Sequence, residues 1–186
     1  SFTRNYINNN IDSITLTETD HKNVLDLKQN FKNKNRIKIL QKKIHEIDGN
    51  FDVIMYLHVL EHIKDDKKEI ELAIKKLNKN GFLIIMVPAH QKIYSNLDKA
   101  VGHYRRYEID YFKKNFINLK TIELLYLDSM GYFLYFLNKI FFKKEIYPSK
   151  FKILIWDKLF TPITFIVDLI LRYKFGKCIL AIYKKD

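Results

Sequence analysis

The fold of this chain is decided by the stretch Phe51-Asp52-Val53-Ile54-Met55-Tyr56-Leu57. It follows the turn sequence Asp48-Gly49-Asn50, and apart from Asp52 its side chains are apolar or aromatic. A nearly continuous apolar run bounded by turn residues is typical of a strand in the middle of a parallel sheet, where both faces are covered. We therefore predict a central strand over residues 51–57.

Strand and helix patterns alternate on both sides of this stretch. They predict strands over residues 13–17, 36–40, 82–87, 120–126 and 177–183, and helices over 21–31, 65–77 and 109–116. Gly81 is expected to end the turn before the strand at 82–87, and Pro88 stops that strand. Strands separated by helices at this rhythm indicate an α/β domain with a mostly parallel, doubly wound sheet. Ligands bind beyond the carboxyl ends of such strands, so Glu18 and the segments after Leu57 and Val87 should converge.

Length and composition set limits on what the chain can be. Its 186 residues suit one domain spanning 1–186, and 47% hydrophobic with 29% charged residues is an ordinary globular composition. One cysteine, Cys178, cannot form an internal disulfide, which favours a reducing compartment such as the cytoplasm. The formal charge of +12 could attract nucleic acid. The lysines are scattered over several elements without a dense basic block, so a nucleic-acid function is not favoured.

Several motifs around the central strand carry a family resemblance. The sequences Phe51-Asp52-Val53-Ile54, Val59-Leu60-Glu61-His62-Ile63 and Leu77-Asn78-Lys79-Asn80-Gly81-Phe82-Leu83-Ile84-Ile85 resemble the middle of class I S-adenosylmethionine-dependent methyltransferases. Further downstream, Val87-Pro88-Ala89, Tyr94-Ser95, Asp98 and Gly102-His103-Tyr104-Arg105-Arg106-Tyr107 are similar to a bacterial branch of small methyltransferases. That branch is often found among glycan and lipid-linked sugar biosynthesis functions. The resemblance spans residues 1–126 and the closing strand at 177–184.

The resemblance implies a Rossmann-like methyltransferase fold with an apolar helical insertion, residues 130–173, before the last strand. It places the first strand and the glycine-rich cofactor loop upstream of residue 1, so that Ser1 lies just after that loop. The chain is therefore expected to be truncated at its N-terminus, and residues 1–186 alone are expected to be inactive. The resemblance predicts a short apolar strand upstream, followed by a glycine-rich turn that ends directly before Ser1.

Candidate cofactor residues follow from the same resemblance. A carboxylate at the end of the strand at 13–17 can accept hydrogen bonds from both ribose hydroxyls of S-adenosylmethionine, which favours Glu18 with Asp20 as its competitor. Lys43 stands where the family commonly carries an acid near the adenine, so backbone groups around Ile44 are expected to serve there. The segment after the central strand, His58 and Val59, is expected to line the methionine end of the cofactor.

The sequence His58-Val59-Leu60-Glu61-His62 also matches the H-x-x-E-H pattern of inverted zinc peptidases. Such a site needs both histidines on one helical face and a third ligand. Because a buried strand ends immediately before His58, and because the sequence offers no clear third ligand, we expect no metal here. For Glu61 a core-polar role and a contact with substrate stay open. His62 is a candidate substrate-binding residue.

The loop Gly102-His103-Tyr104-Arg105-Arg106-Tyr107 is the strongest candidate for contacts with the methyl acceptor. Arg105 and Arg106 offer planar, bidentate donors for carboxylate or phosphate groups. His103 titrates near neutral pH and could take a proton from an attacking hydroxyl, which Tyr107 could orient. The alternative is that both arginines tie a surface loop to nearby acids such as Asp98 or Glu108.

The apolar segment at 130–173 has its own pattern. Its polar residues fall close to one helical stripe: Asp157, Thr161, Thr164, Asp168 and Arg172. Thr161-Pro162 reads as a helix N-cap followed by proline at the first helical position. The stretch free of charge, 159–167, is far shorter than the roughly 20 residues that a membrane span needs. Packing onto the domain or a homodimer partner is favoured, with peripheral contact to the inner membrane face as the alternative.

These observations predict transfer of a methyl group from S-adenosylmethionine to an oxygen or nitrogen nucleophile of a polar small-molecule or glycan acceptor, such as a sugar or lipid-linked saccharide. Two other classes of function remain open at this stage. The first is a non-catalytic Rossmann-like binding domain that has lost the cofactor, which Lys43 makes worth considering. The second is a nucleic-acid-binding or nucleic-acid-modifying protein, which would show steeply salt-dependent retention on DNA or RNA.

Overall fold

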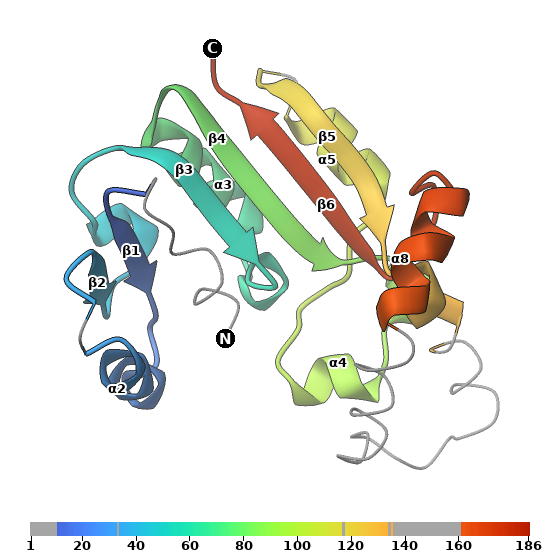
Figure 1. Cartoon of the computed structure of the whole chain (residues 1–186), viewed down its shortest axis with the longest axis horizontal. Helices are drawn as coiled ribbons and strands as arrows, with labels where there is room; N and C mark the ends of the chain where they lie inside the picture. The colour runs from blue at the N-terminus through green and yellow to red at the C-terminus, as the bar shows by residue number, and fades with distance from the viewer. Residues whose placement is uncertain (1–10, 33, 117, 134, 136–160) are drawn as a thin grey trace. The chain divides into compact units, whose positions relative to one another are not determined.

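A computed structural model describes residues 11–32, 34–116, 118–133, 135 and 161–186 (Figure 1). The chain divides into two compact units, Ser1–Gly49 and Asn50–Asp186. Most of residues 130–173, and with them Asp157, lie outside the described residues.

The first unit is built on a short pair of parallel strands. Strand β1 (Ile14–Thr17) pairs with β2 (Ile37–Leu40), in register from Ile14 opposite Ile37 to Thr17 opposite Leu40. Helix α2 (His21–Asn30) connects them, and a 3-10 helix, η1 (Ile44–Glu46), follows β2. These elements match the alternation predicted from the sequence. They bring Glu18 to the carboxyl end of β1.

The second unit is built on a four-stranded sheet with the order β3-β4-β6-β5. Its strands are β3 (Phe51–Leu57), β4 (Leu77–Pro88), β5 (Lys120–Leu127) and β6 (Cys178–Lys184). The pair β3 and β4 is parallel, whereas β6 runs antiparallel to both β4 and β5. The apolar run forms β3 with the predicted bounds, but among the described strands β3 lies at one edge of this sheet and not in its centre.

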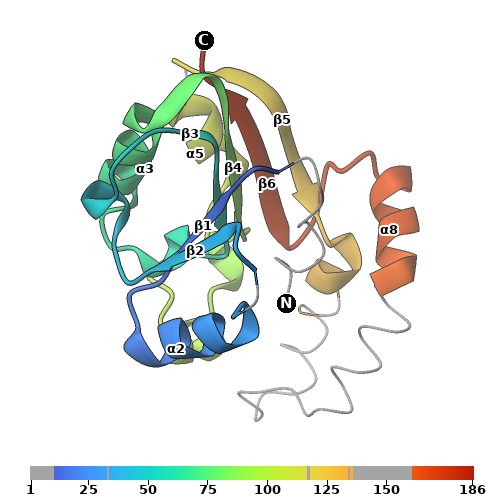
Figure 2. The same ribbon diagram turned by 60° about the vertical axis from the view of Figure 1, so that its left-hand side comes forward.

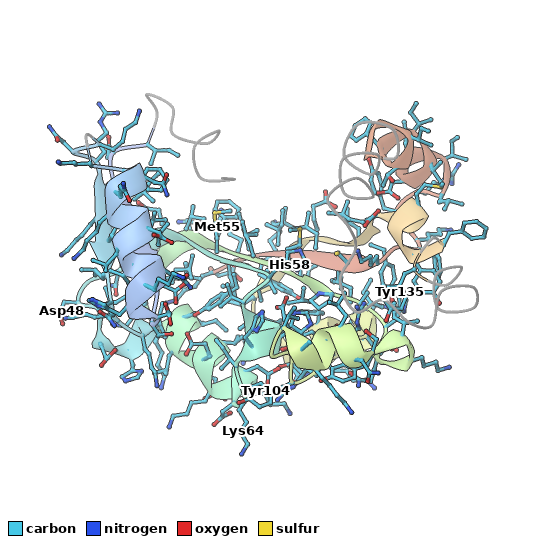
Figure 3. All side chains as sticks on the ribbon, turned by 90° about the horizontal axis from the view of Figure 1, so that it is seen from below. Asp48, Met55, His58, Lys64, Tyr104 and Tyr135 are labelled. Carbon is cyan, nitrogen blue, oxygen red and sulfur yellow. The ribbon has the colours of Figure 1, made fainter. Side chains whose placement is uncertain are left out.

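Helices cover one face of this sheet. They are α3 (Asp66–Lys75) and α5 (Ile109–Asn115), which lie on the same side in Figures 1 and 2. Side chains on that face are fully buried, including Leu83, Ile85 and Tyr183, and Tyr183 stacks on Phe116. On the other face Val53 and Met55 are 46% and 47% exposed, and Met55 can be followed in Figure 3. The alternation along β3 therefore separates a buried face from an open one.

Gly81 occupies a different position from the predicted one. It lies inside β4, because that strand begins at Leu77 and the helix before it ends at Lys75. A Cβ atom at Gly81 would lie 2.9 Å from the backbone oxygen of Asn78 and 3.1 Å from that of Asp52. Glycine is needed here because the irregular start of β4 brings its backbone close to β3.

The remaining elements lie at the ends of the strands. The 3-10 helix η2 (Leu60–His62) follows β3, whereas the 3-10 helix η3 (Gln91–Ile93) and helix α4 (Asn96–Ala100) follow β4. Helix α8 (Thr161–Ile170) precedes β6 and begins at the threonine that the sequence marked as a helix start. The carboxyl end of β3 thus leads into η2. The carboxyl end of β4 leads through η3 and α4 to the loop that carries His103.

Candidate active site

Glu18 and Asp20 differ in how their carboxylates are used. Asp20 is the N-cap of α2 and accepts a hydrogen bond of 3.0 Å from the backbone N–H of Asn23. Glu18 Oε1 accepts from the backbone N–H groups of Thr19 and Asp20, at 2.7 and 2.9 Å. Glu18 Oε2 also accepts from the Asn23 side chain at 3.4 Å, so both carboxylates hold this turn and the choice of ribose-binding acid stays a prediction.

Ile44 is the first residue of η1, and the turn around it is closed by its own residues. The backbone N–H of Lys43 donates to Glu46 Oε2 at 2.6 Å. This bond to the Lys43 backbone is the main reason why the pKa of Glu46 lies below its ordinary value. The carboxylate in this turn is therefore that of Glu46, and it accepts a hydrogen bond from the backbone of the turn itself.

In the second unit, β3 ends at a residue with unusual backbone geometry. His58 has a φ of 55°, and its backbone N–H donates to the oxygen of Met86 at 2.8 Å. Few residues other than glycine adopt this conformation, and strained residues cluster at functional sites. The next residue, Val59, is 42% exposed. The predicted cofactor-lining residues thus lie at the carboxyl end of β3, and ligands bind at the carboxyl ends of strands in this class of sheet.

The His58 side chain acts as a cation toward Glu61. Its Nδ1 lies 3.3 Å from Glu61 Oε1. Hydrogen bonds with Cys178 and Glu61 raise the pKa of His58 to about 9, against the opposing effect of partial burial. His58 is therefore protonated at neutral pH and compensates part of the charge of the buried carboxylate.

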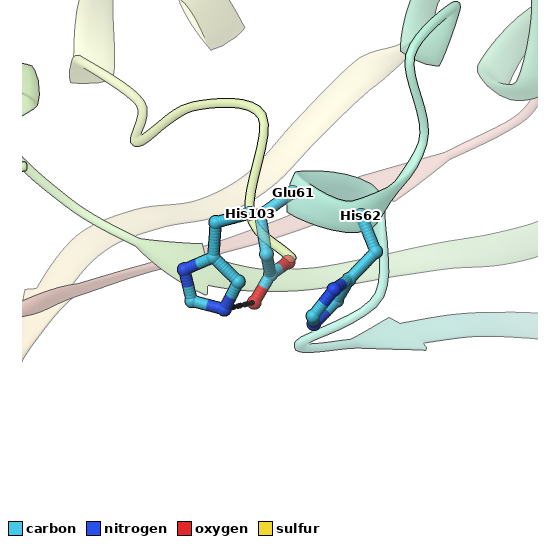
Figure 4. Close-up of side chains that lie close together, drawn as sticks. All are labelled: Glu61, His62 and His103. Atoms are coloured by element: carbon cyan, nitrogen blue, oxygen red, sulfur yellow. Dashed lines mark ion pairs between the residues drawn. The ribbon is translucent and has the colours of Figure 1, made fainter. Parts of the chain in front are cut away.

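Glu61 lies at the centre of the site. Its side chain is fully buried, and among the described residues its Oε2 atom has no hydrogen-bond partner. Its Oε1 atom lies 4.0 Å from His103 Nε2, and Figure 4 shows the two side chains facing each other.

His62, at the end of η2, is exposed, and its ring lies edge-on to that of His103 with centroids 4.7 Å apart.

A buried acid, Asp98, fixes His103 from the opposite side. Asp98 Oδ1 lies 2.9 Å from His103 Nδ1 and accepts a hydrogen bond from Arg106 Nε, also at 2.9 Å. Burial would raise the pKa of Asp98, but the hydrogen bonds from Arg106 and His103 outweigh it and lower that pKa. An ionised carboxylate only accepts, so Nδ1 of His103 carries the hydrogen and Nε2 offers its lone pair. The arrangement can accept a proton at Nε2.

The sequence predicts that the two loop arginines bind the acceptor, and in the structure both are held by acids of their own unit. Arg105 donates to Asp66 Oδ1 and to the backbone oxygen of Lys64. Arg106 is only 7% exposed, paired with Asp98, and donates also to the backbone oxygen of Ala89. The alternative in which both arginines hold the loop to nearby acids therefore fits the structure, with Asp66 and Asp98 as those acids.

Tyr107 is likewise buried, which corrects the expectation that it orients the acceptor hydroxyl. It is 2% exposed, and its hydroxyl donates to the backbone oxygen of Leu60 and to Asp66 Oδ2, at 3.2 and 2.9 Å. Asp66 also accepts from Tyr111 at 3.0 Å. Asp66 is the residue that sequence reasoning missed, because Asp65 and Asp66 read only as the start of a helix.

The chain is similar to known methyltransferases in sequence and in fold. Residues 5–126 match the family model described as a methyltransferase domain. Comparison with curated protein sequences gives no match. Among solved structures, the chain is similar to the N-methyltransferase NodS from Bradyrhizobium japonicum WM9 in complex with S-adenosyl-L-homocysteine, with a TM-score of 0.55 and 13% identity over 93% of this chain.

Two further structures show the same fold. A putative sarcosine dimethylglycine methyltransferase from Galdieria sulphuraria gives a TM-score of 0.58 at 14% identity, over 94% of this chain and 70% of its own. Coclaurine N-methyltransferase bound to N-methylheliamine and S-adenosyl-L-homocysteine gives a TM-score of 0.59 at 12% identity. The match covers 92% of this chain and 60% of that enzyme's chain. The chain spans 66% of NodS. The predicted Rossmann-like α/β methyltransferase fold is confirmed, and this chain belongs to the methyltransferase-domain family.

Proposed function

We propose that the complete protein transfers a methyl group from S-adenosylmethionine to an oxygen or nitrogen nucleophile of a small polar acceptor. The acceptor atom attacks the methyl carbon, the bond from that carbon to sulfur breaks, and S-adenosylhomocysteine leaves. Positioning supplies most of the rate enhancement in such a displacement. Family membership and fold support the reaction type.

The observation that carries the proposal is the hydrogen bond between Asp98 and His103. It holds the imidazole with Nε2 free to accept a proton, beside η2 at the carboxyl end of β3. His103 is therefore the base that takes the acceptor's proton, and His62 beside it is a contact for the acceptor. Arg106 acts as a positioning residue through Asp98, whereas Arg105 and Tyr107 hold the loop through Asp66.

The acceptor is proposed to be a sugar or a lipid-linked saccharide, on the resemblance of the loop at 102–107 to enzymes of glycan biosynthesis. A panel of sugar nucleotides, lipid-linked saccharides and amines, each incubated with methyl-labelled S-adenosylmethionine, tests this. Label in a saccharide hydroxyl is the expected result. Label in an amine alone would move the acceptor to the nitrogen class, which NodS and coclaurine N-methyltransferase represent by name.

On the cofactor side, we propose Glu18 and the backbone groups at Ile44 as the contacts that the first unit makes. In the complete protein, Glu18→Ala should weaken S-adenosylmethionine binding about ten-fold or more. Losing charge-assisted hydrogen bonds costs roughly 1.5–3 kcal/mol. Titration calorimetry measures the affinity, and Asp26→Ala in the exposed part of α2 is the matched control. Unchanged affinity in Glu18→Ala would remove the assignment.

Helix α8 presents an apolar surface that we propose as a homodimer contact. Its buried residues are polar: Asp168 is 4% exposed and accepts from the backbone N–H groups of Asp128 and Ser129. Its exposed residues are apolar, with Phe165 and Ile170 69% and 72% exposed. Among the described helices, none combines the length and apolar character needed to cross a bilayer. Large apolar patches on soluble domains mark interaction sites.

Changing Phe165 and Ile170 together to serine should therefore shift the complete protein from dimer to monomer without lowering its melting temperature. Light scattering at micromolar concentration measures the mass, and Val101→Ser, an exposed valine elsewhere in this unit, is the control. A monomeric parent protein would contradict the dimer. If that monomer also sedimented with anionic vesicles, and the double variant did not, the surface would be a peripheral membrane contact at the cytoplasmic side instead.

A further inference from the structure

A histidine–glutamate cluster includes the proposed base, His103. It consists of Glu61 and His62 from η2 and His103 from the loop after α4 (Figure 4). Each residue offers one ligand atom, and these atoms all lie within 4.8 Å of one another. Two imidazole nitrogens and one carboxylate are a ligand set that Zn²⁺ and other divalent transition metals accept. This set differs from the H-x-x-E-H pattern, because it contains His103 in place of His58 and uses Glu61 as a ligand.

The buried carboxylate is an independent reason to expect a cation. Glu61 is fully buried, and its Oε2 has no hydrogen-bond partner among the described residues. His58 interacts with the other oxygen, Oε1. Buried charges are normally paired or coordinate a metal ion, and an unpartnered buried oxygen is costly. A metal ion beside Glu61 would remove that cost.

The surroundings of His103 match those of a metal-binding histidine. Such histidines almost always donate their second ring N–H to a carboxylate or carbonyl, which fixes the ring and its tautomer. Asp98 provides this acceptor at 2.9 Å from Nδ1 and is itself held by Ser95 and Arg106. His103 Nε2, which faces Glu61, is therefore held in a fixed orientation. The lone pair of Nε2 can either accept a proton or bind a metal ion, so in the metal-bound protein His103 is a ligand and not the base.

We propose that Glu61, His62 and His103 together bind one divalent transition metal ion of the Zn²⁺ type. Three protein ligands leave at least one coordination position open, as in catalytic zinc sites. A second step rests on the proposed function: an acceptor hydroxyl fills the open position. A metal-bound hydroxyl would lose its proton to solvent near neutral pH, without His103 as the base, so the metal would favour an oxygen nucleophile over an amine.

Metal binding can be tested without cofactor or acceptor. The complete protein is stripped with a chelator and titrated with Co²⁺, whose visible absorption strengthens when imidazole and carboxylate ligands replace water. We expect one Co²⁺ per chain, displaced by Zn²⁺ added in equal amount. His62→Ala, Glu61→Gln and His103→Ala should each weaken binding at least ten-fold. His45→Ala, which removes an exposed histidine outside the cluster, is the matched control and should bind as the parent does.

The outcomes separate this inference from the proposed function. His62 is exposed, so its replacement tests the cluster without opening the core. Absence of Co²⁺ binding in the parent, or equal binding in the parent and in His62→Ala with its fold intact, would overturn the metal site. Methyl transfer by a protein that binds no metal would leave the proposed function standing. Metal binding without methyl transfer to any acceptor would instead remove the proposed function and keep the site.

Discussion

In the complete protein, His103→Ala should lower methyl transfer by about 10²–10⁴-fold, the contribution typical of a general base. The reason is that Nε2 of His103 faces Glu61 in a fixed tautomer, so its removal takes away the group that receives the acceptor's proton. Affinity for S-adenosylmethionine should stay nearly constant, because His103 is proposed to contact the acceptor and not the cofactor. Single-turnover rates and calorimetry measure the two quantities separately.

Tyr104→Ala is the matched control for this variant. Tyr104 is the next residue of the same loop and is 55% exposed, and its backbone N–H, which the substitution keeps, donates to the backbone oxygen of Glu61. It should retain turnover close to that of the parent. A His103→Ala protein that melts at a lower temperature but keeps its turnover per folded molecule would contradict the catalytic assignment. His103 would then be a residue that only holds the loop.

Arg106→Ala should destabilise the protein by about 3–5 kcal/mol, the cost of breaking a buried ion pair by removing one partner. The side chains of Arg106 and Asp98 are 5% and 1% exposed, so the carboxylate would be left charged and without its main partner. Arg106→Lys should recover only part of this loss, because an ammonium group cannot reproduce the planar contacts with Asp98 and with the backbone oxygen of Ala89.

The destabilisation caused by Arg106→Ala should become smaller as the pH falls. The pKa of Asp98 is lowered in the folded protein, because the hydrogen bonds from Arg106 and His103 outweigh the effect of burial. Its contribution to stability is therefore fully present above the unfolded pKa of about 3.9 and is lost as pH falls through the folded value. Arg106→Ala should therefore lower the free energy of unfolding most near pH 7 and less below about pH 4.

Chemical denaturation at two pH values measures this difference in the free energy of unfolding. Lys99→Ala, an exposed position on α4 next to the same acid, should stay within about 0.5 kcal/mol of the parent. A loss below about 1 kcal/mol in Arg106→Ala at pH 7 would show that the pair does not hold the loop, since exposed pairs contribute that little.

The strands could be predicted because their signal is local. Residues 51–57 are apolar over a short run bounded by turn residues, and the structure gives β3 the same bounds. The helix before β4 was predicted too long, since Ile74 and Leu77 continue the helical spacing although the chain has already turned toward the sheet. That helix ends where it does because Leu77 pairs with Phe51 in the sheet. The sequence does not reveal this pairing.

The roles of the loop residues could not be predicted, because their partners come from distant parts of the sequence. Asp66 is 39 positions from Arg105, and nothing near either residue indicates their pairing. The same holds for Glu61 and His103, which the fold brings together. A local motif shows which side chains are available, whereas burial decides which of them face a ligand.

Helix α8 shows a related limit of sequence reasoning. The polar stripe containing Thr164 and Asp168 was visible in the sequence, but a stripe does not say which side of a helix faces the protein. In the structure both residues are buried, and Asp168 receives two backbone N–H groups that would otherwise lack a partner. Buried N–H groups need acceptors, so the polar side turns inward and the apolar side is exposed.

The central claim is that this family member moves a methyl group from S-adenosylmethionine. The most direct measurement incubates the complete protein with methyl-labelled S-adenosylmethionine and the acceptor panel, and quantifies S-adenosylhomocysteine and labelled product together by mass spectrometry. The account predicts equal amounts of both products with the parent protein and a loss of both in His103→Ala. Formation of neither product, by a folded protein that also shows no calorimetric binding of the cofactor, would contradict it.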